Sequence, residues 1–165
     1  MSEHVDKNGE WAALIGRLFI AFGVIEKVTH ECMRLWLKDP IYTNLKSTPL
    51  SKRIDLVSRL VPEQGFKQDL VAEFEQALKQ SKELAEYRNL VAHNPLMLVL
   101  FEDCGDFREA ITHVHKEEKY IELDELQLIV KQAENIENKL MGLLVLSKFD
   151  GQELPALTKK GSCTH

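Results

Sequence analysis

Glu86-Tyr87-Arg88-Asn89-Leu90-Val91-Ala92-His93-Asn94-Pro95 is the stretch that decides how the chain folds. It closes a long row of apolar residues spaced three and four apart, which is the spacing of one face of an α-helix. The row runs through Phe66, Leu70, Phe74, Ala77, Leu84 and Val91, with Ser81 and Arg88 filling two of its places. Asn94-Pro95 ends the helix, because the residue before a proline is pushed out of the α region. The sequence therefore predicts a long helix that ends at His93 and carries an arginine in its apolar stripe.

Arg88 needs a partner in that position. An unpaired guanidinium in an apolar stripe is costly, so it requires a carboxylate, backbone carbonyls, an anionic ligand or a hydrated interface. His93 lies about 140° round the helix from Arg88, and it shares a face with Asn89, Glu86 and Lys82. On the last turn, His93 is also close to the free carbonyls of the helix end, which favour its protonated form.

The region before this helix supplies a candidate partner for Arg88. Apolar residues from Trp11 to Trp36 keep the helical rhythm, so we expect a first helix from about Glu10 to Lys38. Glu26 lies in its middle and is a candidate partner for Arg88. A simpler alternative is a solvated pair between Glu26 and His30, which are four residues apart.

The other segments complete the expected fold. We expect a loop at 41–47 and a short helix from Thr48-Pro49 to just before Pro62, in which Lys52, Arg53 and Arg59 either solvate the surface or attract phosphate. Apolar or alternating runs at 96–101 and 110–115 predict a β-hairpin. A last helix is expected from about 122 to 148. The fold class is thus mainly α, an up-and-down bundle of about four helices with a small β-hairpin before the last helix. Residues 1–150 form one domain, and 151–165 are predicted to be a flexible C-terminal tail.

Composition limits the classes of function. The chain has 165 residues, a net charge of −5 and a pI near 5.7, so any contact with nucleic acid needs a local basic patch. No apolar run is long enough for a membrane span, and a cytoplasmic location is the expectation. Three cysteines without CxxC spacing suggest neither a disulfide framework nor a zinc site, and we expect no metal and no cofactor.

The Arg-Asn-Leu-Val-Ala-His motif at 88–93 resembles that of the HEPN superfamily (higher eukaryotes and prokaryotes nucleotide-binding domains). The family signature is an arginine, a polar residue, three to five further residues and a histidine, and Arg88, Asn89 and His93 match it. The predicted first helix, with Glu26 in its middle, is similar to the acidic first helix of the family. The likeness spans roughly residues 10–148, but its specific part is only six residues long.

This resemblance implies a metal-independent endoribonuclease that acts as a homodimer, often as a toxin or a defence effector. It implies that RNA is cut to a 2′,3′-cyclic phosphate, with His93 as general base or acid and Arg88 stabilising the phosphorane. Asn89 would orient the imidazole or hold the scissile phosphate. We expect Glu26, Glu86, Tyr87 and Asn94 to support the site. A cognate antitoxin such as a nucleotidyltransferase is an implied partner.

Other interpretations of the motif stay open. Arg88 could be a structural anchor, with Asn89 and His93 capping the helix end. The chain could also be a non-catalytic HEPN-like module for dimerisation or for binding a partner, since several branches of the family keep the fold without nuclease activity.

Overall fold

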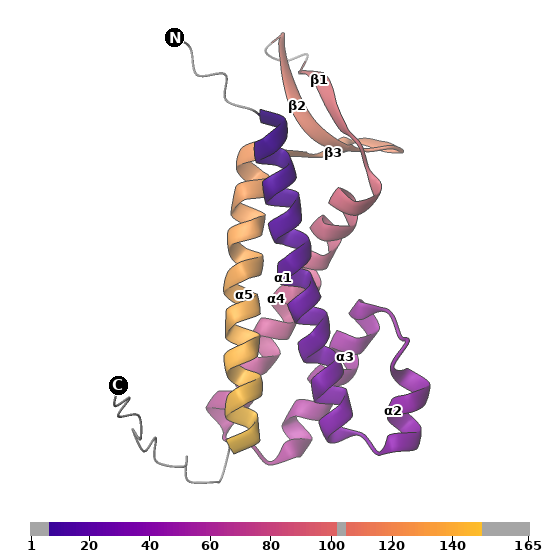
Figure 1. Cartoon of the computed structure of the whole chain (residues 1–165), viewed down its shortest axis with the longest axis vertical. Helices are drawn as coiled ribbons and strands as arrows, with labels where there is room; N and C mark the ends of the chain where they lie inside the picture. Colours follow the sequence, from indigo (N-terminus) through magenta and orange to yellow (C-terminus); the bar gives the residue numbers. More distant parts are fainter. Residues whose placement is uncertain (1–6, 102–104, 150–165) are drawn as a thin grey trace, which may run out of the picture.

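The computed structural model describes residues 7–101 and 105–149, which form a helical bundle capped by a small sheet (Figure 1). The order of elements is α1 (Lys7–Trp36), α2 (Asp39–Leu45), α3 (Leu50–Leu60), a 3₁₀ turn η1 (Val61–Gln64), α4 (Gln68–His93), β1 (Leu96–Phe101), β2 (Asp106–His113), β3 (Lys116–Glu122) and α5 (Leu123–Phe149). The mainly α class with strands before the last helix is confirmed.

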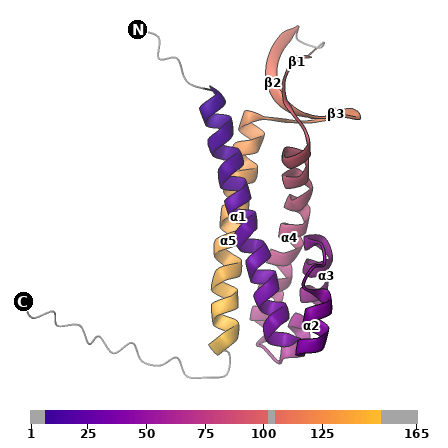
Figure 2. The same cartoon turned by 45° about the vertical axis from the view of Figure 1, so that its right-hand side comes forward.

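Three long helices carry the core. α1 and α5 lie side by side along their length, α4 packs against α5, and α3 fills the space between α1 and α4 (Figures 1 and 2). The buried faces follow the apolar spacing of the sequence. The largest fully buried side chains of the helices are Trp11, Phe22, Phe74, Leu18, Ile25, Met33, Ile54, Leu78, Leu126 and Leu140. Full burial of each large apolar side chain contributes roughly 1.5–3 kcal/mol.

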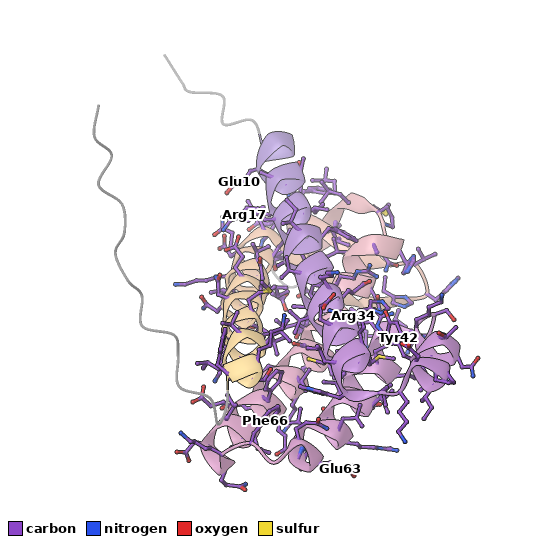
Figure 3. All side chains as sticks on the ribbon, turned by 60° about the horizontal axis from the view of Figure 1, so that its bottom comes forward. Glu10, Arg17, Arg34, Tyr42, Glu63 and Phe66 are labelled. Atoms are coloured by element: carbon purple, nitrogen blue, oxygen red, sulfur yellow. The ribbon has the colours of Figure 1, made fainter. Side chains whose placement is uncertain are left out.

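Polar contacts set the register of α1 against α5. The guanidinium of Arg17, which lies on the side of α1 that faces α5 (Figure 3), donates from Nε and Nη2 to the two carboxylate oxygens of Glu134, both at 2.7 Å. This hydrogen bonding lowers the pKa of Glu134. The pair is largely exposed, so it contributes little to stability and mainly aligns the two helices.

The foot of the bundle is closed by aromatic packing. Phe66, which lies where the chain turns from η1 into α4 (Figure 3), is 5.9 Å from Trp36 between ring centroids, and Phe74 lies at the same distance from Trp36. The turn itself uses Gly65 at φ 74°, a left-handed conformation that glycine adopts at low cost.

One expectation for the connecting segments was wrong, and another was incomplete. Asp39–Leu45 is the helix α2, whereas 41–47 was expected to be a loop. Pro40 stops α1 from continuing but also suits the first turn of a new helix, which explains the error. The expected hairpin is a sheet of three antiparallel strands in the order β1-β2-β3, because 116–122 forms an additional strand.

The third strand connects directly to the last helix. β3 pairs with β2 in a register that sets Ile121 opposite Ile111, both buried under the sheet. It ends at Glu122, and α5 begins at Leu123. Among the helices of the described segments, none is long and apolar enough to cross a membrane. The expected tail at 151–165 lies outside the described residues.

Candidate functional site

Arg88 lies in the buried face of α4, as its place in the apolar row predicts. Ser81, two turns earlier in the same row, is fully buried and donates its hydroxyl to the carbonyl of Ala77 at 2.8 Å. Arg88 is closer to the C-terminal end of α4, and its side chain is 29% exposed. The guanidinium is therefore neither sealed in the core nor fully hydrated.

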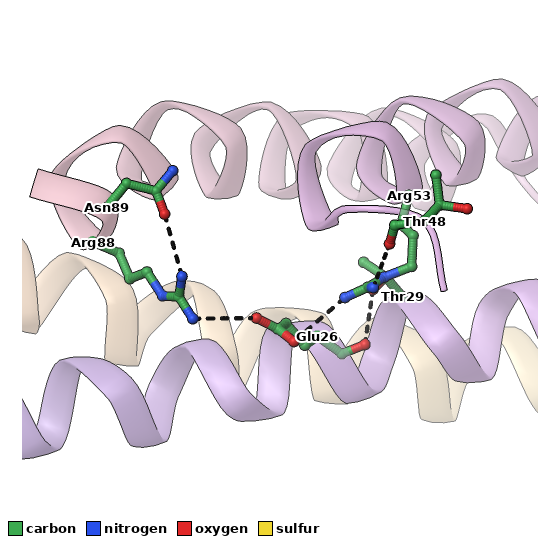
Figure 4. Close-up of polar contacts among 6 residues, drawn as sticks. All are labelled: Glu26, Thr29, Thr48, Arg53, Arg88 and Asn89. Atoms are coloured by element: carbon green, nitrogen blue, oxygen red, sulfur yellow. Dashed lines mark hydrogen bonds and ion pairs between the residues drawn. The ribbon is translucent and has the colours of Figure 1, made fainter. Parts of the chain in front are cut away.

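Glu26 of α1 faces this guanidinium. One of its carboxylate oxygens is 3.7 Å from Nη2 of Arg88, and the other is 3.4 Å from Nη2 of Arg53 on α3 (Figure 4). Glu26 was one candidate partner for Arg88 in the sequence, and the structure places the two together. That Arg53 shares the same carboxylate was not expected. Two guanidinium groups thus meet one carboxylate between three helices, which leaves a local excess of one positive charge.

Arg53 is the fixed member of this trio. It is only 6% exposed, and its Nη1 donates to the carbonyl of Thr48 at 2.7 Å, while its Nε donates to the hydroxyl of the buried Thr29 at 3.4 Å (Figure 4). The sequence grouped Arg53 with Lys52 and Arg59 as surface cations. The side chains of Lys52 and Arg59 are exposed, whereas the side chain of Arg53 points inward. Its neighbours Ile54 and Val57 on the buried face of α3 were the available signal.

Arg88 retains unused capacity to donate. Its Nη1 donates to the side-chain oxygen of Asn89 at 3.2 Å, and its guanidinium carbon lies 5.2 Å from the centre of the Phe19 ring. The buried Nε–H has no hydrogen-bond partner among the described residues. A buried donor without a partner is costly, so Arg88 is the less well satisfied of the two arginines on Glu26.

His93 and Asn89 lie on another side of the same helix end. Both are exposed, and His93 forms no hydrogen bond or ion pair with the described residues. Within one chain, the helix directs His93 about 140° away from Arg88. The structure therefore brings Arg88 together with Glu26 and Asn89, but it does not bring His93 to the same point.

The remaining predicted residues have distinct surroundings. Asn94 ends α4, where its amide nitrogen donates to the carbonyl of Leu90 at 2.8 Å and its side-chain oxygen accepts the backbone N–H of Val114 at 2.9 Å. It thus ties the helix end to the turn between β2 and β3. Glu86 and Tyr87 face a groove beside β3, away from Arg88.

His30 reports the electrostatics of this region. Burial lowers the pKa of its imidazole, and the positive charge of Arg53 lowers it further, while Glu26 acts in the opposite direction. His30 is only partly buried and follows Glu26 by one turn of α1. Protonation of His30 is thus opposed by the same excess positive charge that surrounds Glu26.

Comparisons with known proteins give no further assignment. No protein-family model matches the chain, and neither a curated protein nor a solved structure is significantly similar to it.

Proposed function

We propose that the chain is a metal-independent endoribonuclease of HEPN type that acts as a homodimer. The observation that carries this proposal is the arginine pair on Glu26, because one carboxylate neutralises only one of the two guanidinium groups. A phosphodiester is a suitable second anion. The long, partly exposed contact between Arg88 and Glu26 contributes at most about 1 kcal/mol, and phosphate accepts shorter, bidentate bonds from an arginine.

His93 would supply the proton transfer. An exposed imidazole can accept the proton of a ribose 2′-hydroxyl or protonate the leaving 5′-oxygen, while Arg88 donates to the charged phosphorane. The divergence of Arg88 and His93 on one helix requires the two to come from different subunits or to approach the same phosphate from two directions. A homodimer satisfies this requirement, since it sets the α4 end of one copy against that of the other.

The exposed face of α1 next to this site supports a dimer. Ile20 is 69% exposed, and an added Cβ at either Gly16 or Gly23 would meet nothing within 4 Å. Gly23 precedes Glu26 by one turn, so the flat surface continues into the arginine site. A second helix can approach such a surface closely, and Ile20 would be buried between the two.

The proposal is tested by RNA cleavage in EDTA with the full chain and its variants. We expect the wild type to cut a mixed-sequence RNA to products with 2′,3′-cyclic phosphate ends. His93→Ala should lower the rate by about a hundredfold or more, the usual contribution of a general acid or base. His115→Ala, which removes an exposed imidazole from the turn between β2 and β3, is the matched control and should keep full activity. Cleavage that survives in His93→Ala, or that stops in EDTA, would contradict the proposal.

A non-catalytic HEPN-like module is the second candidate, and the Arg88–Glu26 ion pair within one chain favours it. The variant Arg88→Lys distinguishes the two candidate functions, because lysine keeps the positive charge opposite Glu26 but lacks the planar guanidinium group. A nuclease would lose most of its activity in this variant while keeping its thermal stability. For a module, wild type and variant would both be inactive on RNA, and only Arg88→Ala would lower stability or weaken dimerisation.

A further inference from the structure

A second surface of the molecule has features of a peptide-binding site. A groove of about 310 Å³ lies beside β3 and is lined by 118–121 of that strand, by Glu86, Tyr87 and Leu90 of α4, and by Glu125 of α5. We call it the β3 groove. β3 crosses above the end of α4 before it enters α5 (Figures 1 and 2), and the groove lies between these elements.

The β3 groove follows the free edge of the sheet. Four consecutive residues of β3, 118–121, line the groove, and the pairing of β3 with β2 is irregular just before them, where the register shifts between Thr112 and His113. Within the described part of the chain, β3 pairs with β2 alone. Its outer edge thus offers backbone N–H and C=O groups to another strand.

The chemistry of the groove selects a cationic occupant. Glu86, Glu118 and Glu125 contribute three carboxylates against the single ammonium of Lys119. None of the three carboxylates forms an ion pair with another described residue. Tyr87 and Tyr120 add partly exposed rings, 40% and 39% exposed, and the ring of Tyr120 also packs edge-on against Phe101 with the centroids 5.2 Å apart. A lysine or arginine can lay its aliphatic stem against such rings and place its charge among the carboxylates.

Pairing of β3 with β3 of a second copy is disfavoured by the same charges. A symmetric antiparallel pair must set one residue opposite itself. Centring on Glu118 or on Lys119 places like charges face to face, and centring on Tyr120 sets Glu118 opposite Glu122. Like charges directly opposite destabilise a strand pair. In these three registers the charges of β3 therefore oppose pairing with its own copy, and they favour a strand of opposite charge.

We propose that the β3 groove binds an extended, basic segment of a partner protein, which pairs with β3 as a fourth strand. Strand addition of this kind obtains affinity from main-chain hydrogen bonds and specificity from pockets for alternate side chains. The segment would carry arginine or lysine at alternate positions, so that one face of the added strand meets the three glutamates. This interaction is separate from the arginine site and does not depend on ribonuclease activity.

The test uses the full chain and a fluorescent peptide of alternating arginine and valine. Fluorescence anisotropy should show saturable binding, and a peptide with glutamate in place of arginine should not bind. The double variant Glu118→Lys, Glu125→Lys should weaken binding roughly tenfold. Glu75→Lys is the matched control, because Glu75 is exposed on α4 outside the groove. It should bind like the wild type.

Amide hydrogen exchange distinguishes strand addition from simple charge attraction. We expect slower exchange in 116–122 when the peptide is bound. A peptide with N-methylated alternate residues should bind much more weakly, because it cannot donate to the strand edge. The proposal is overturned by an absence of saturable binding, by an equal loss of affinity in Glu75→Lys, or by binding that leaves exchange in β3 unchanged.

Discussion

Glu26 has two neighbours that differ in mobility. Arg53 is held from three sides in the buried interior, whereas Arg88 is partly exposed and reaches the same carboxylate only at 3.7 Å. A ligand can therefore take Arg88 from Glu26 without unpacking the bundle, because Arg53 still compensates the carboxylate. The contact of Glu26 with Arg53 is therefore structural, whereas its contact with Arg88 can be exchanged for a ligand.

The titration of His30 should respond to these charges in opposite directions. Because Glu26 raises the pKa of His30, Glu26→Gln should lower that pKa below the wild-type value. Lys27 lowers it, so Lys27→Gln should raise it, and the two variants serve as controls for each other. The measurement is an NMR titration of the imidazole protons. Shifts of the same sign in both variants would show that the arrangement of charges is wrong.

Because of His30, the free energy of unfolding should also decrease as the pH is lowered. Its pKa in the folded protein lies below the usual 6.5, so the unfolded chain takes up the proton first as the pH drops. The free energy of unfolding is then unaffected by His30 above pH 6.5 and decreases below it. Urea unfolding between pH 7.5 and 5.5 should show this decrease, and His30→Gln should reduce it. The pKa of Glu31 is lowered from its usual 4.5 to about 2. Glu31 therefore stabilises the fold above pH 4.5, and this contribution is lost as the pH falls from 4.5 toward 2.

At the scale of elements, the end of α4 is joined to the sheet by one side chain. Asn94 satisfies the carbonyl of Leu90 on the helix and the N–H of Val114 in the strand turn. The backbone of Thr112 adds a bond to the carbonyl of Pro95 at 3.3 Å. The position of the sheet above the helices, and with it the β3 groove, thus depends on this short connection.

Asn94→Ala should lower the free energy of unfolding by about 1–2 kcal/mol, the combined value of two ordinary hydrogen bonds. Exchange of the Val114 amide should become faster. Asn94→Asp is the comparison, because it keeps the acceptor for Val114 but loses the donor to Leu90 and places a negative charge at the negative end of the helix. We expect its Val114 amide to remain protected although stability falls. An unchanged exchange rate in Asn94→Ala would exclude the joining role.

Long elements were more predictable than short ones, for physical reasons. α1, α4 and α5 each repeat an apolar spacing over many turns, so a few exceptions such as Arg88 do not obscure the pattern. α2 has no buried residue and only a proline as its start signal. β3 has charged residues at most positions, and it therefore lacks the apolar alternation by which strands are recognised.

The candidate site was predictable only in part for the same reason. The pairing of Glu26 with Arg88 could be inferred because each residue interrupts an apolar helix and needs a partner. Arg53 lies among other cations in the sequence, and the signal that it points inward is its place beside Ile54 and Val57 on the buried face of α3. The direction of His93 follows from helix geometry, but whether a second subunit meets it depends on an assembly that one chain does not define.

At the scale of the whole molecule, the exposed face of α1 is where we expect two copies to meet. Ile20→Glu should turn a dimer into a monomer at micromolar concentration, because it would place two charges in an apolar contact. Leu128→Glu is the matched control, since Leu128 is 62% exposed on α5 and its substitution should leave the dimer intact. Light scattering after size-exclusion chromatography measures the mass. A wild type that is monomeric at every concentration would exclude the dimeric site.

The junction between β3 and α5 has a mechanical consequence. No loop separates Glu122 from Leu123, so β3 continues directly into the 27-residue helix α5. A tilt of the sheet cannot be absorbed by slack in the chain at this joint. A force on the edge of the sheet would be transmitted along α5, and through the Arg17–Glu134 ion pair into α1.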